Sequence, residues 1–277
     1  MRRLVAFGLP ALALGFLSFA AFGDEPGGEP QSDFGDTTEA PVADVPEIPT
    51  RRTFGPGEYL QFSVRYGVVR AGDALLQVKG IRKVDGHDCY HLLSKAESNS
   101  FFDRVHKVRD RVESYLDTTL FVSRRFEKHI REGKYKKDEV LHFDPESLMV
   151  TYDGKEPKTF DIAPRSLDVL ASFYFVRLLD LEIGHEYHIE NHADKKNHPL
   201  RVKVHRRERV KVPAGTFDCL VVEPFLRSEG IFQQKGRLVI WLTDDARKLP
   251  VQMKSKTAIG WVSCVLTDYR ESKFPVR

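Results

Sequence analysis

The strongest constraint on the fold of this chain is an alternation of apolar and polar residues that recurs between residues 57 and 270. In residues 60–66 every second residue is apolar, and Gln61, Ser63 and Arg65 stand between them. Side chains point to opposite faces of a β-strand in turn, so this pattern predicts a strand with one buried and one wet face. Similar runs recur roughly every 8 to 12 residues, separated by residues that favour turns. The chain is therefore predicted to be mainly β, with antiparallel neighbours.

Two short segments predict tight hairpins within this pattern. Asp85-Gly86 is a turn dipeptide between two alternating runs, and Gly215 in residues 212–217 is free to adopt a positive φ. A sheet of about a dozen strands accumulates twist and curls. The prediction is a large curled antiparallel sheet, either an open barrel or a β-spiral, with two packed layers as an alternative.

One segment departs from the alternation. After Pro164, apolar residues recur at steps of three and four up to Leu181, and Ser166 is available as the N-cap. This spacing predicts one central α-helix that ends before Gly184 and packs against the sheet.

The N-terminal 50 residues differ from the rest. Arg2 and Arg3 precede an apolar run over residues 4–22, which ends in small residues, so residues 1–23 are predicted to be a signal peptide. The alternative is an uncleaved anchor, because the run approaches the length that spans a bilayer. Residues 24–50 hold eight acidic residues and no Lys or Arg, and they are rich in Pro and Gly. They are predicted to be an acidic disordered linker to a β domain over residues 51–277.

Three cysteines, Cys89, Cys219 and Cys264, are too few for a fold held together by disulfides. In an oxidising compartment they allow one disulfide and one thiol, with three possible pairings. Three buried thiols that act as small apolar side chains are the alternative.

Four blocks carry a family resemblance. Residues 57–74, 166–177, 212–217 and 240–251 occur in the order of the DUF3108 family of exported bacterial proteins, which the chain resembles over about residues 57–270. The resemblance implies a protein of the periplasm or cell envelope. It also implies a curved antiparallel sheet similar to the half-barrels and β-spirals of lipoprotein carriers. The family supplies no established activity and no agreed active site.

Residues that could perform catalysis or bind a metal ion do not form a recognisable motif. Four histidines (His185, His188, His192 and His198) follow the predicted helix, but their spacing is loose, and an exposed polar loop explains them. Asp244 and Asp245 are adjacent carboxylates of the kind used in acid–base catalysis, but residues that close a hairpin also show this pattern. The sequence contains no nucleophile elbow, phosphate loop or zinc-protease motif. We therefore assign no catalytic residue, metal ligand or cofactor.

Two groups of residues are candidates for binding. Lys203, Arg207 and Arg209 belong to a basic ribbon that fits an anionic surface, such as lipid phosphates or an anionic glycan, or that simply faces solvent. Nucleic acid is not expected as a partner, because the chain is predicted to be exported and the ribbon lacks interleaved aromatic residues. The second group is aromatic and is predicted to face the inner side of the curled sheet, where it either fills the core or contacts an apolar ligand; it consists of Phe62, Tyr66, Phe173, Tyr174 and Trp241.

These observations favour a non-enzymatic binding protein of the periplasm or cell envelope. Its expected partner is a lipid or another apolar ligand, and its expected role is assembly or maintenance of the envelope. The main alternative is an interaction scaffold without a ligand pocket, which binds envelope proteins or glycan. An uncharacterised hydrolase is the third hypothesis, and it requires clustered titratable groups inside a pocket.

Overall fold

The computed structural model describes residue 49 and residues 51–226, 238–257 and 260–272. The predicted signal peptide, residues 1–23, lies outside the described residues, as does the predicted linker except for residue 49.

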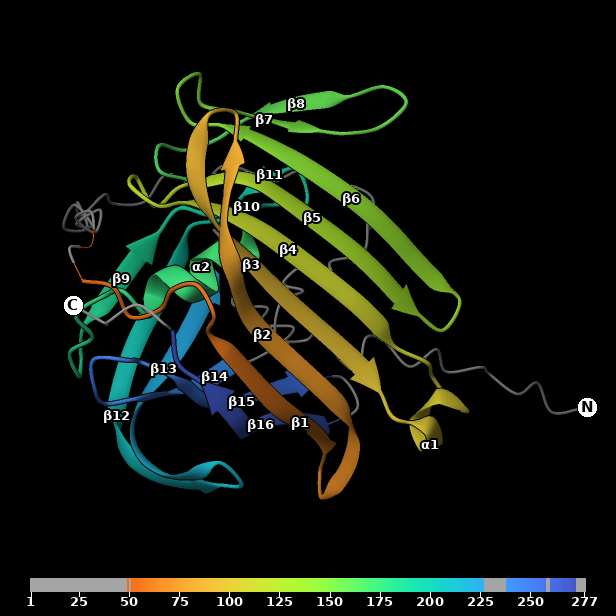
Figure 1. Ribbon diagram of the computed structural model, residues 1–277, viewed down its shortest axis with the longest axis vertical. Coiled ribbons are helices and arrows are strands. Elements are labelled where there is room, and N and C mark those ends of the chain that lie inside the picture. Colours follow the sequence, from red (N-terminus) through yellow and green to blue (C-terminus); the bar gives the residue numbers. More distant parts are fainter. Residues whose placement is uncertain (1–48, 50, 227–237, 258–259, 273–277) are drawn as a thin grey trace, which may run out of the picture.

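Most of the described chain belongs to one antiparallel sheet of 14 strands, in the order β8-β7-β6-β5-β4-β3-β2-β1-β16-β15-β14-β13-β12-β9 (Figure 1). Its strands are β1 (Tyr59–Tyr66), β2 (Val69–Val84), β3 (His87–Ser98), β4 (Arg109–Asp117), β5 (Ser123–Glu132), β6 (Tyr135–Asp144), β7 (Met149–Tyr152), β8 (Lys158–Asp161), β9 (Glu186–Ile189), β12 (Leu200–Val212), β13 (Gly215–Leu226), β14 (Leu238–Thr243), β15 (Pro250–Thr257) and β16 (Gly260–Arg270). A small hairpin of β10 (His192–Ala193) and β11 (Lys196–Asn197) stands apart from this sheet. Helix α1 spans Ser100–Asp103 and helix α2 spans Val169–Val176.

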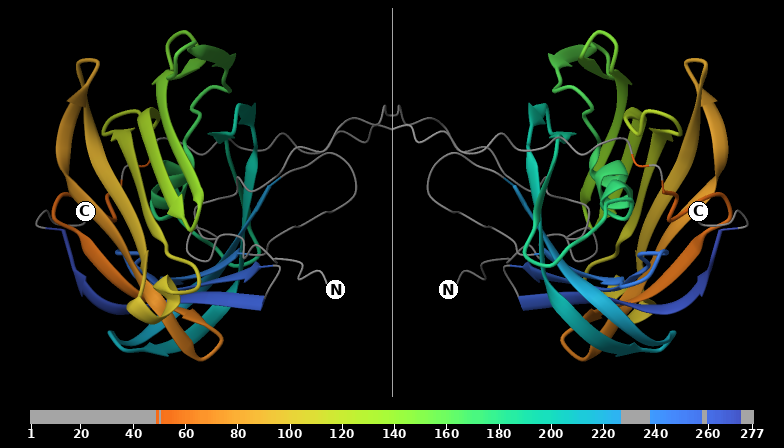
Figure 2. Two further views of the ribbon diagram at one scale, coloured as in Figure 1. Left: turned by 90° about the vertical axis from the view of Figure 1, so that its right-hand side faces the viewer. Right: turned by 90° about the vertical axis from the view of Figure 1, so that its left-hand side faces the viewer.

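The sheet curls around α2 but does not close, because its two end strands, β8 and β9, do not pair with each other (Figure 2). The β10–β11 hairpin contacts the β8 side instead. The backbone N–H of Lys195 donates to the hydroxyl of Tyr152 at 2.7 Å, and the amide of Asn197 donates to the carbonyl of Asp161 at 3.1 Å. The predicted fold class, a large curled antiparallel sheet with a central helix, is confirmed. Neither described helix is long and apolar enough to cross a membrane.

Both predicted hairpins are present. The β2–β3 turn has positive φ at Asp85 (48°) and Gly86 (86°), the backbone that a two-residue hairpin with right-handed twist requires. The β12 and β13 strands pair from Val212 opposite Gly215, which has a φ of 144°. Turn chemistry therefore set the register of these two strand pairs.

Helix α2 is shorter than the sequence predicts, and its N-cap is Asp168 rather than Ser166. The fully buried Asp168 carboxylate accepts hydrogen bonds from the backbone N–H groups of Leu170 and Ala171, both at 2.9 Å. The hydroxyls of Ser114 and Ser123 donate to its other oxygen at 2.7 and 2.6 Å. These strand hydroxyls are distant in sequence, so helical periodicity could not identify the cap.

A second helix, α1, was not predicted. Its four residues are fewer than a periodic pattern needs. The Asn99 side chain caps it by accepting from the N–H groups of Phe101 and Phe102 at 3.1 and 3.0 Å, and the Asn99 amide donates to the carbonyl of Arg70 at 2.8 Å. The cap thereby ties α1 to the start of β2.

A buried ion pair holds α2 inside the sheet. Arg177, the C-cap residue, is fully buried and donates to both carboxylate oxygens of Glu58 at 2.7 Å. Its remaining N–H groups donate to the carbonyls of Lys248 (3.0 Å), Arg247 (3.3 Å) and Thr53 (3.4 Å). Every nitrogen of the guanidinium therefore has an acceptor, which a charge in an apolar core requires.

All three cysteines are buried free thiols. They lie on β3, β13 and β16, and no two of these strands are neighbours in the sheet. Burial raises the pKa of Cys89 and of Cys219 to about 12, and it raises that of Cys264 as well. Of the two alternatives, the structure favours three apolar thiols.

Removal of one partner of the Arg177–Glu58 pair is expected to destabilise the protein strongly. Arg177→Met should lower the free energy of unfolding by about 3–5 kcal/mol, because it leaves a buried carboxylate without its counter-charge. Arg70→Met is the matched control, since Arg70 also binds both oxygens of one carboxylate, that of Asp73, but is exposed; it should cost about 0–1 kcal/mol. Urea unfolding measures both. The double variant Glu58→Leu/Arg177→Met should lose less than the sum of its single variants, and additive losses would contradict the assignment.

The thiols are expected to be chemically silent until the protein unfolds. With no reductant present, iodoacetamide should modify none of the three in the native protein within the time that labels all three in urea, because the reactive form is the thiolate. Intact-mass measurement counts the labels. A single label on the unfolded chain would show a disulfide.

Candidate functional site

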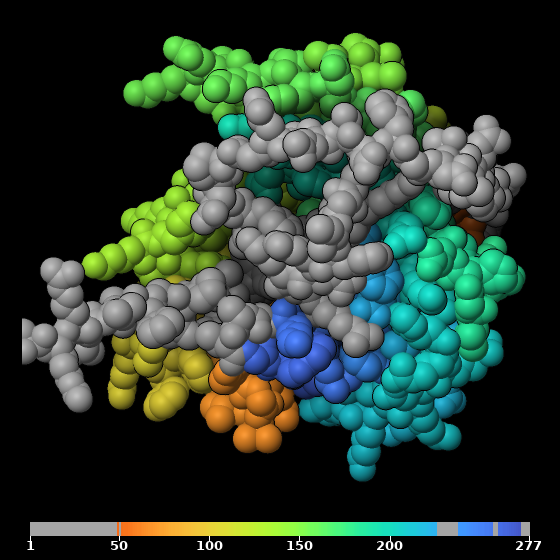
Figure 3. Space-filling model, turned by 180° about the vertical axis from the view of Figure 1, so that it is seen from behind, coloured from red at the N-terminus to blue at the C-terminus, as the bar shows by residue number. Residues whose placement is uncertain are grey.

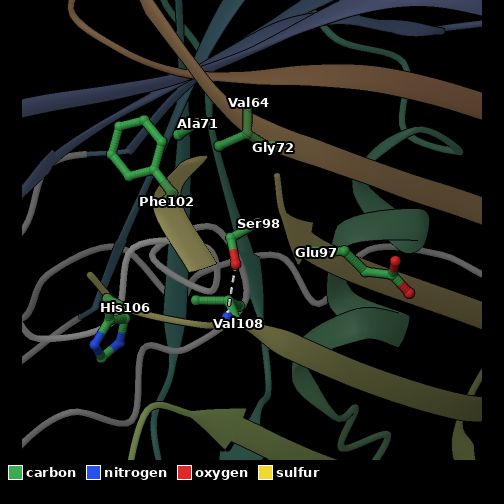
Figure 4. A pocket seen from close by; sticks show the side chains of 8 residues that line it. All are labelled: Val64, Ala71, Gly72, Glu97, Ser98, Phe102, His106 and Val108. Carbon is green, nitrogen blue, oxygen red and sulfur yellow. Dashed lines mark hydrogen bonds between the residues drawn. The ribbon is translucent and has the colours of Figure 1, made fainter. Parts of the chain in front are cut away.

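A pocket lies at the end of the sheet where α1 covers the inner face. Its empty volume, which includes space open to solvent, is about 280 Å³, and it is lined by Val64, Ala71, Gly72, Glu97, Ser98, Phe102, His106 and Val108 (Figure 4). These residues come from the end of β1, the start of β2, the end of β3, and the segment from α1 to β4. The Glu97 carboxylate points away from the other lining side chains (Figure 4). The lining is therefore mainly apolar.

Close backbone packing forms one wall of this pocket. The register of β1 against β2 shifts after Val64, so Ala71 lies at a bulge next to Gly72. A Cβ atom on Gly72 would lie 2.0 Å from the carbonyl oxygen of Glu97. Only glycine allows β2 and β3 to approach this closely, and it leaves the pocket wall without a side chain at that point.

Polar groups fix the segment that carries Phe102 and His106. The Ser98 hydroxyl accepts from the N–H of Val108 at 2.8 Å and donates to Asp103 at 2.5 Å. Arg109 donates to both oxygens of Asp103, at 3.0 and 2.6 Å. This network holds the α1 segment against the ends of β3 and β4.

His106 supplies the unsatisfied polar atom of the pocket. Its Nε2 is buried and has no hydrogen-bond partner in the described structure. Its ring is packed so closely on Gly133 that a Cβ atom there would lie 3.2 Å from ring atoms Cε1 and Nδ1. A buried ring nitrogen without a partner loses free energy.

Two buried carboxyl groups neighbour His106. Burial, the negative charge of Asp110 and a hydrogen bond between the two groups together raise the pKa of Glu132 to about 7, with burial as the largest cause. Burial also raises the pKa of Asp110, although Asp110 accepts from the backbone N–H of Arg131 at 2.7 Å. Like charges in contact cannot both ionise at low cost, so the pair holds one shared proton below about pH 7.

A second polar cluster lies farther along the inner face. Lys128 contacts Glu139 at 3.1 Å and Asp194 of the β10–β11 hairpin at 3.7 Å. Lys137 contacts the same two carboxylates at 3.2 and 3.1 Å. These four groups neutralise one another, and they join the hairpin to β5 and β6.

The predicted aromatic ligand-binding residues divide into two groups. Phe62, Tyr174 and Trp241 are buried in the core. Tyr66 and Phe173 are only partly buried and pack against that core. Tyr66 follows Val64 by two residues on β1, so it shares the inner face with the pocket.

The basic ribbon on β12 carries acidic partners. Arg207 contacts Asp244 at 2.5 Å, Arg209 contacts Asp218 at 3.8 Å, and Lys203 contacts Glu186 at 3.7 Å. These pairs offset the positive charge that the sequence displays. Its role as an anionic-surface site stays a prediction.

The other sequence candidates have local structural contacts. Asp245 accepts from Arg247 at 2.6 Å, and Asp244 lies 3.9 Å from Lys248, so both carboxylates pair within the turn after β14. His192 is buried against aromatic rings, and its Nδ1 contacts the Asn197 carboxamide at 2.8 Å, whereas His185 is exposed. Within the described ranges, no three His, Cys, Asp or Glu side chains are placed to hold a metal ion.

Sequence reasoning missed most of the pocket. Val64 was recognised as an inward residue and Val108 as the start of an alternating run, but Phe102 and His106 lie in a segment with no periodic pattern. The available signal was Asn99, a helix-capping residue followed closely by two phenylalanines.

The carboxyl pair is expected to make stability depend on pH. The folded-state pKa of Glu132 lies above its unfolded value, so the folded state retains a proton that the unfolded chain loses as pH rises from about 4.5 to about 7. This group therefore contributes a loss of stability across that window. Glu132→Gln should remove this loss. The free energy of unfolding of the variant, measured relative to that of wild type, should therefore be about 1–2 kcal/mol higher at pH 8 than at pH 5. Denaturant unfolding at both pH values measures the gain, and Glu127→Gln on the outer face of β5 is the control. An equal offset at both pH values would contradict the assignment.

Comparison with solved structures finds three matches that cover most of this chain. The first is a β-barrel-like DUF1849 protein from Brucella abortus, with a TM-score of 0.57 and 9% identity over 79% of this chain and 99% of that one. The others have lower TM-scores. A candidate lipoprotein from Parabacteroides distasonis has a TM-score of 0.35 and 12% identity, and covers 79% of this chain and 98% of that one. A candidate exported protein with a YmcC-like fold from Bacteroides fragilis has a TM-score of 0.36 and 9% identity, and covers 81% and 100%.

The Brucella abortus structure agrees with the curled, open β architecture, and at 9% identity it is evidence for the fold alone. No curated protein sequence matches the chain. The family model of DUF3108, described as a protein of unknown function, matches residues 61–267, which include nearly the whole sheet and both helices. The chain therefore belongs to the DUF3108 family.

Proposed function

We propose that this protein is a non-enzymatic binding protein of the periplasm or cell envelope that holds the apolar end of a lipid-like ligand in the pocket beside α1. The observation that carries the proposal is the combination of an apolar lining with one buried ring nitrogen, Nε2 of His106, that has no hydrogen-bond partner among the described residues. Apolar pockets with few polar groups are typical of sites for amphipathic small molecules. The N-terminal pattern of residues 1–23 supports export.

The pocket volume limits the ligand. Most of the 280 Å³ is open to solvent, and the enclosed cavity is about 10 Å³, roughly the space of one water molecule. The end of an acyl chain or a small apolar group therefore enters only if the lining side chains move apart, and the rest of a lipid must lie outside the pocket. Tyr66, on the same face of β1 as Val64, is the predicted aromatic residue best placed to contact that part.

Ligand binding is tested by filling the pocket. cis-Parinaric acid, a fluorescent fatty acid, should bind the purified protein, and palmitate should displace it. Ala71→Leu places extra carbon atoms in the pocket and is expected to weaken binding at least tenfold. Ala96→Leu is the control, because Ala96 is equally buried on the neighbouring strand but does not line the pocket. Binding that survives Ala71→Leu, or that both variants weaken equally, would contradict the pocket assignment.

A second measurement identifies the natural ligand class. Native mass spectrometry of protein purified from its own envelope should show an added mass. Organic extraction should remove this mass, and analysis of the extract should identify a lipid. Protein that repeatedly carries no added mass, together with no parinaric acid binding, would overturn the proposal.

A further inference from the structure

The exposed apolar side chains of this protein gather at one end. Of the ten large hydrophobic residues that are exposed among the described residues, six occupy neighbouring turns and strand ends on the side of α1. We call these six residues the end patch; they are Val68, Val69, Phe101, Val105, Tyr135 and Trp261. Val68 is 93% exposed, Val105 is 68% exposed and Phe101 is 65% exposed, so they are not partly covered core residues.

Backbone hydrogen bonds join the segments that carry the end patch. The N–H of Gly67 donates to the carbonyl of Trp261 at 3.4 Å, which links the β1–β2 turn to the start of β16. The N–H of Asn99 donates to the carbonyl of Ala71 at 2.9 Å and links α1 to β2. The N–H of Gly133 donates to the carbonyl of Lys107 at 2.8 Å and links the β5–β6 turn to the α1 segment. Seen from behind, the β1–β2 turn (orange) and the α1 segment (yellow) lie next to each other at the lower edge (Figure 3).

The end patch is interleaved with unpaired positive charge. Arg104, Lys107, Lys134 and Lys136 are exposed on the same segments, and no ion pair joins any of them to a described residue. The neighbouring carboxylates Asp73 and Asp103 are already paired with arginines, at 2.6 Å each. The end patch therefore has a net positive rim, unlike Lys203, Arg207 and Arg209 on β12, which have acidic partners.

We infer that this end of the protein docks on the surface of an anionic lipid bilayer, with the end patch entering the interface and the four cations contacting lipid phosphates. Tryptophan and tyrosine favour the bilayer interface, and each nearby Lys or Arg adds attraction to anionic lipid. The apolar side chains lie on separate turns with cations between them, and a fluid lipid surface can adapt to such an arrangement. This inference does not rest on the ligand proposal, because the pocket lining and the end patch share no residue.

The two tryptophans allow a direct test. Trp241 is buried and Trp261 is 45% exposed, so Trp241→Phe leaves Trp261 as the reporter of the end patch. Vesicles of phosphatidylcholine with phosphatidylglycerol should shift Trp261 emission to the blue, and brominated lipids should quench it. Vesicles of phosphatidylcholine alone should bind at least tenfold more weakly, and high salt should release the protein from the anionic vesicles.

Variants made in the wild-type background separate the apolar and charged contributions to binding. Co-sedimentation of each variant with vesicles is the measurement. Val68→Asp/Phe101→Asp should weaken binding to anionic vesicles at least tenfold, whereas Ile81→Asp/Ile183→Asp, which changes exposed apolar residues elsewhere, should leave it unchanged. Lys107→Glu/Lys134→Glu should also weaken binding at least tenfold, since each cation contributes about fivefold. Lys155→Glu/Lys158→Glu, which changes exposed lysines at the β7–β8 end of the sheet, is the charge control. All the substituted positions are exposed, and circular dichroism verifies that each variant is folded.

Three results would overturn the inference: no binding to anionic vesicles, equal binding to both vesicle types, or equal effects of the patch and control variants. A protein partner for this end would give the first result. Ala71→Leu should leave vesicle binding intact, so failure of the pocket proposal and failure of this inference are distinguishable.

Discussion

The rest of the fold depends on the contact between Arg177 and Glu58. One guanidinium joins the end of α2, the segment before β1 and the turn between β14 and β15, which are far apart in the sequence. Its ring neighbours, Phe54 and Tyr174, lie within 5.4 and 5.3 Å and exclude water from the pair. Such a charge is tolerated in a core only when every donor has an acceptor. Because Arg177 must lie where all of these acceptors meet, the contact fixes the position of α2 inside the sheet.

An open sheet must still protect its end strands and its inner face. Here the β10–β11 hairpin contacts the β5–β8 side of the open sheet without forming a strand ladder. Its Asp194 contacts Lys128 and Lys137, and two further hydrogen bonds each join a backbone group to a side chain. A ladder would complete a closed barrel, whereas side-chain contacts leave the sheet open. The apolar pocket lies away from this hairpin, at the end covered by α1.

Helix α1 connects the two proposals in space. Phe102 lines the pocket, whereas the adjacent Phe101 is exposed in the end patch. The face of α1 that carries Phe102 packs on the protein, whereas the face that carries Phe101 has no packing role. Exposure of this apolar face to water costs free energy. A bilayer surface at that end would cover Phe101 and place the pocket beside a source of acyl chains.

The sequence by itself determined the strand pattern, the antiparallel pairing and the hairpin at Asp85-Gly86, because alternation and turn chemistry act between residues that are close along the chain. It did not determine that Asp168 caps α2, since Ser114 and Ser123 reach it from other strands, or that Glu132 shares a proton with Asp110. Only the tertiary structure decided which aromatic residues are covered and which cations on β12 meet carboxylates. The pocket and the end patch have the same origin: they form where turns distant in sequence come together, and no local pattern records that meeting.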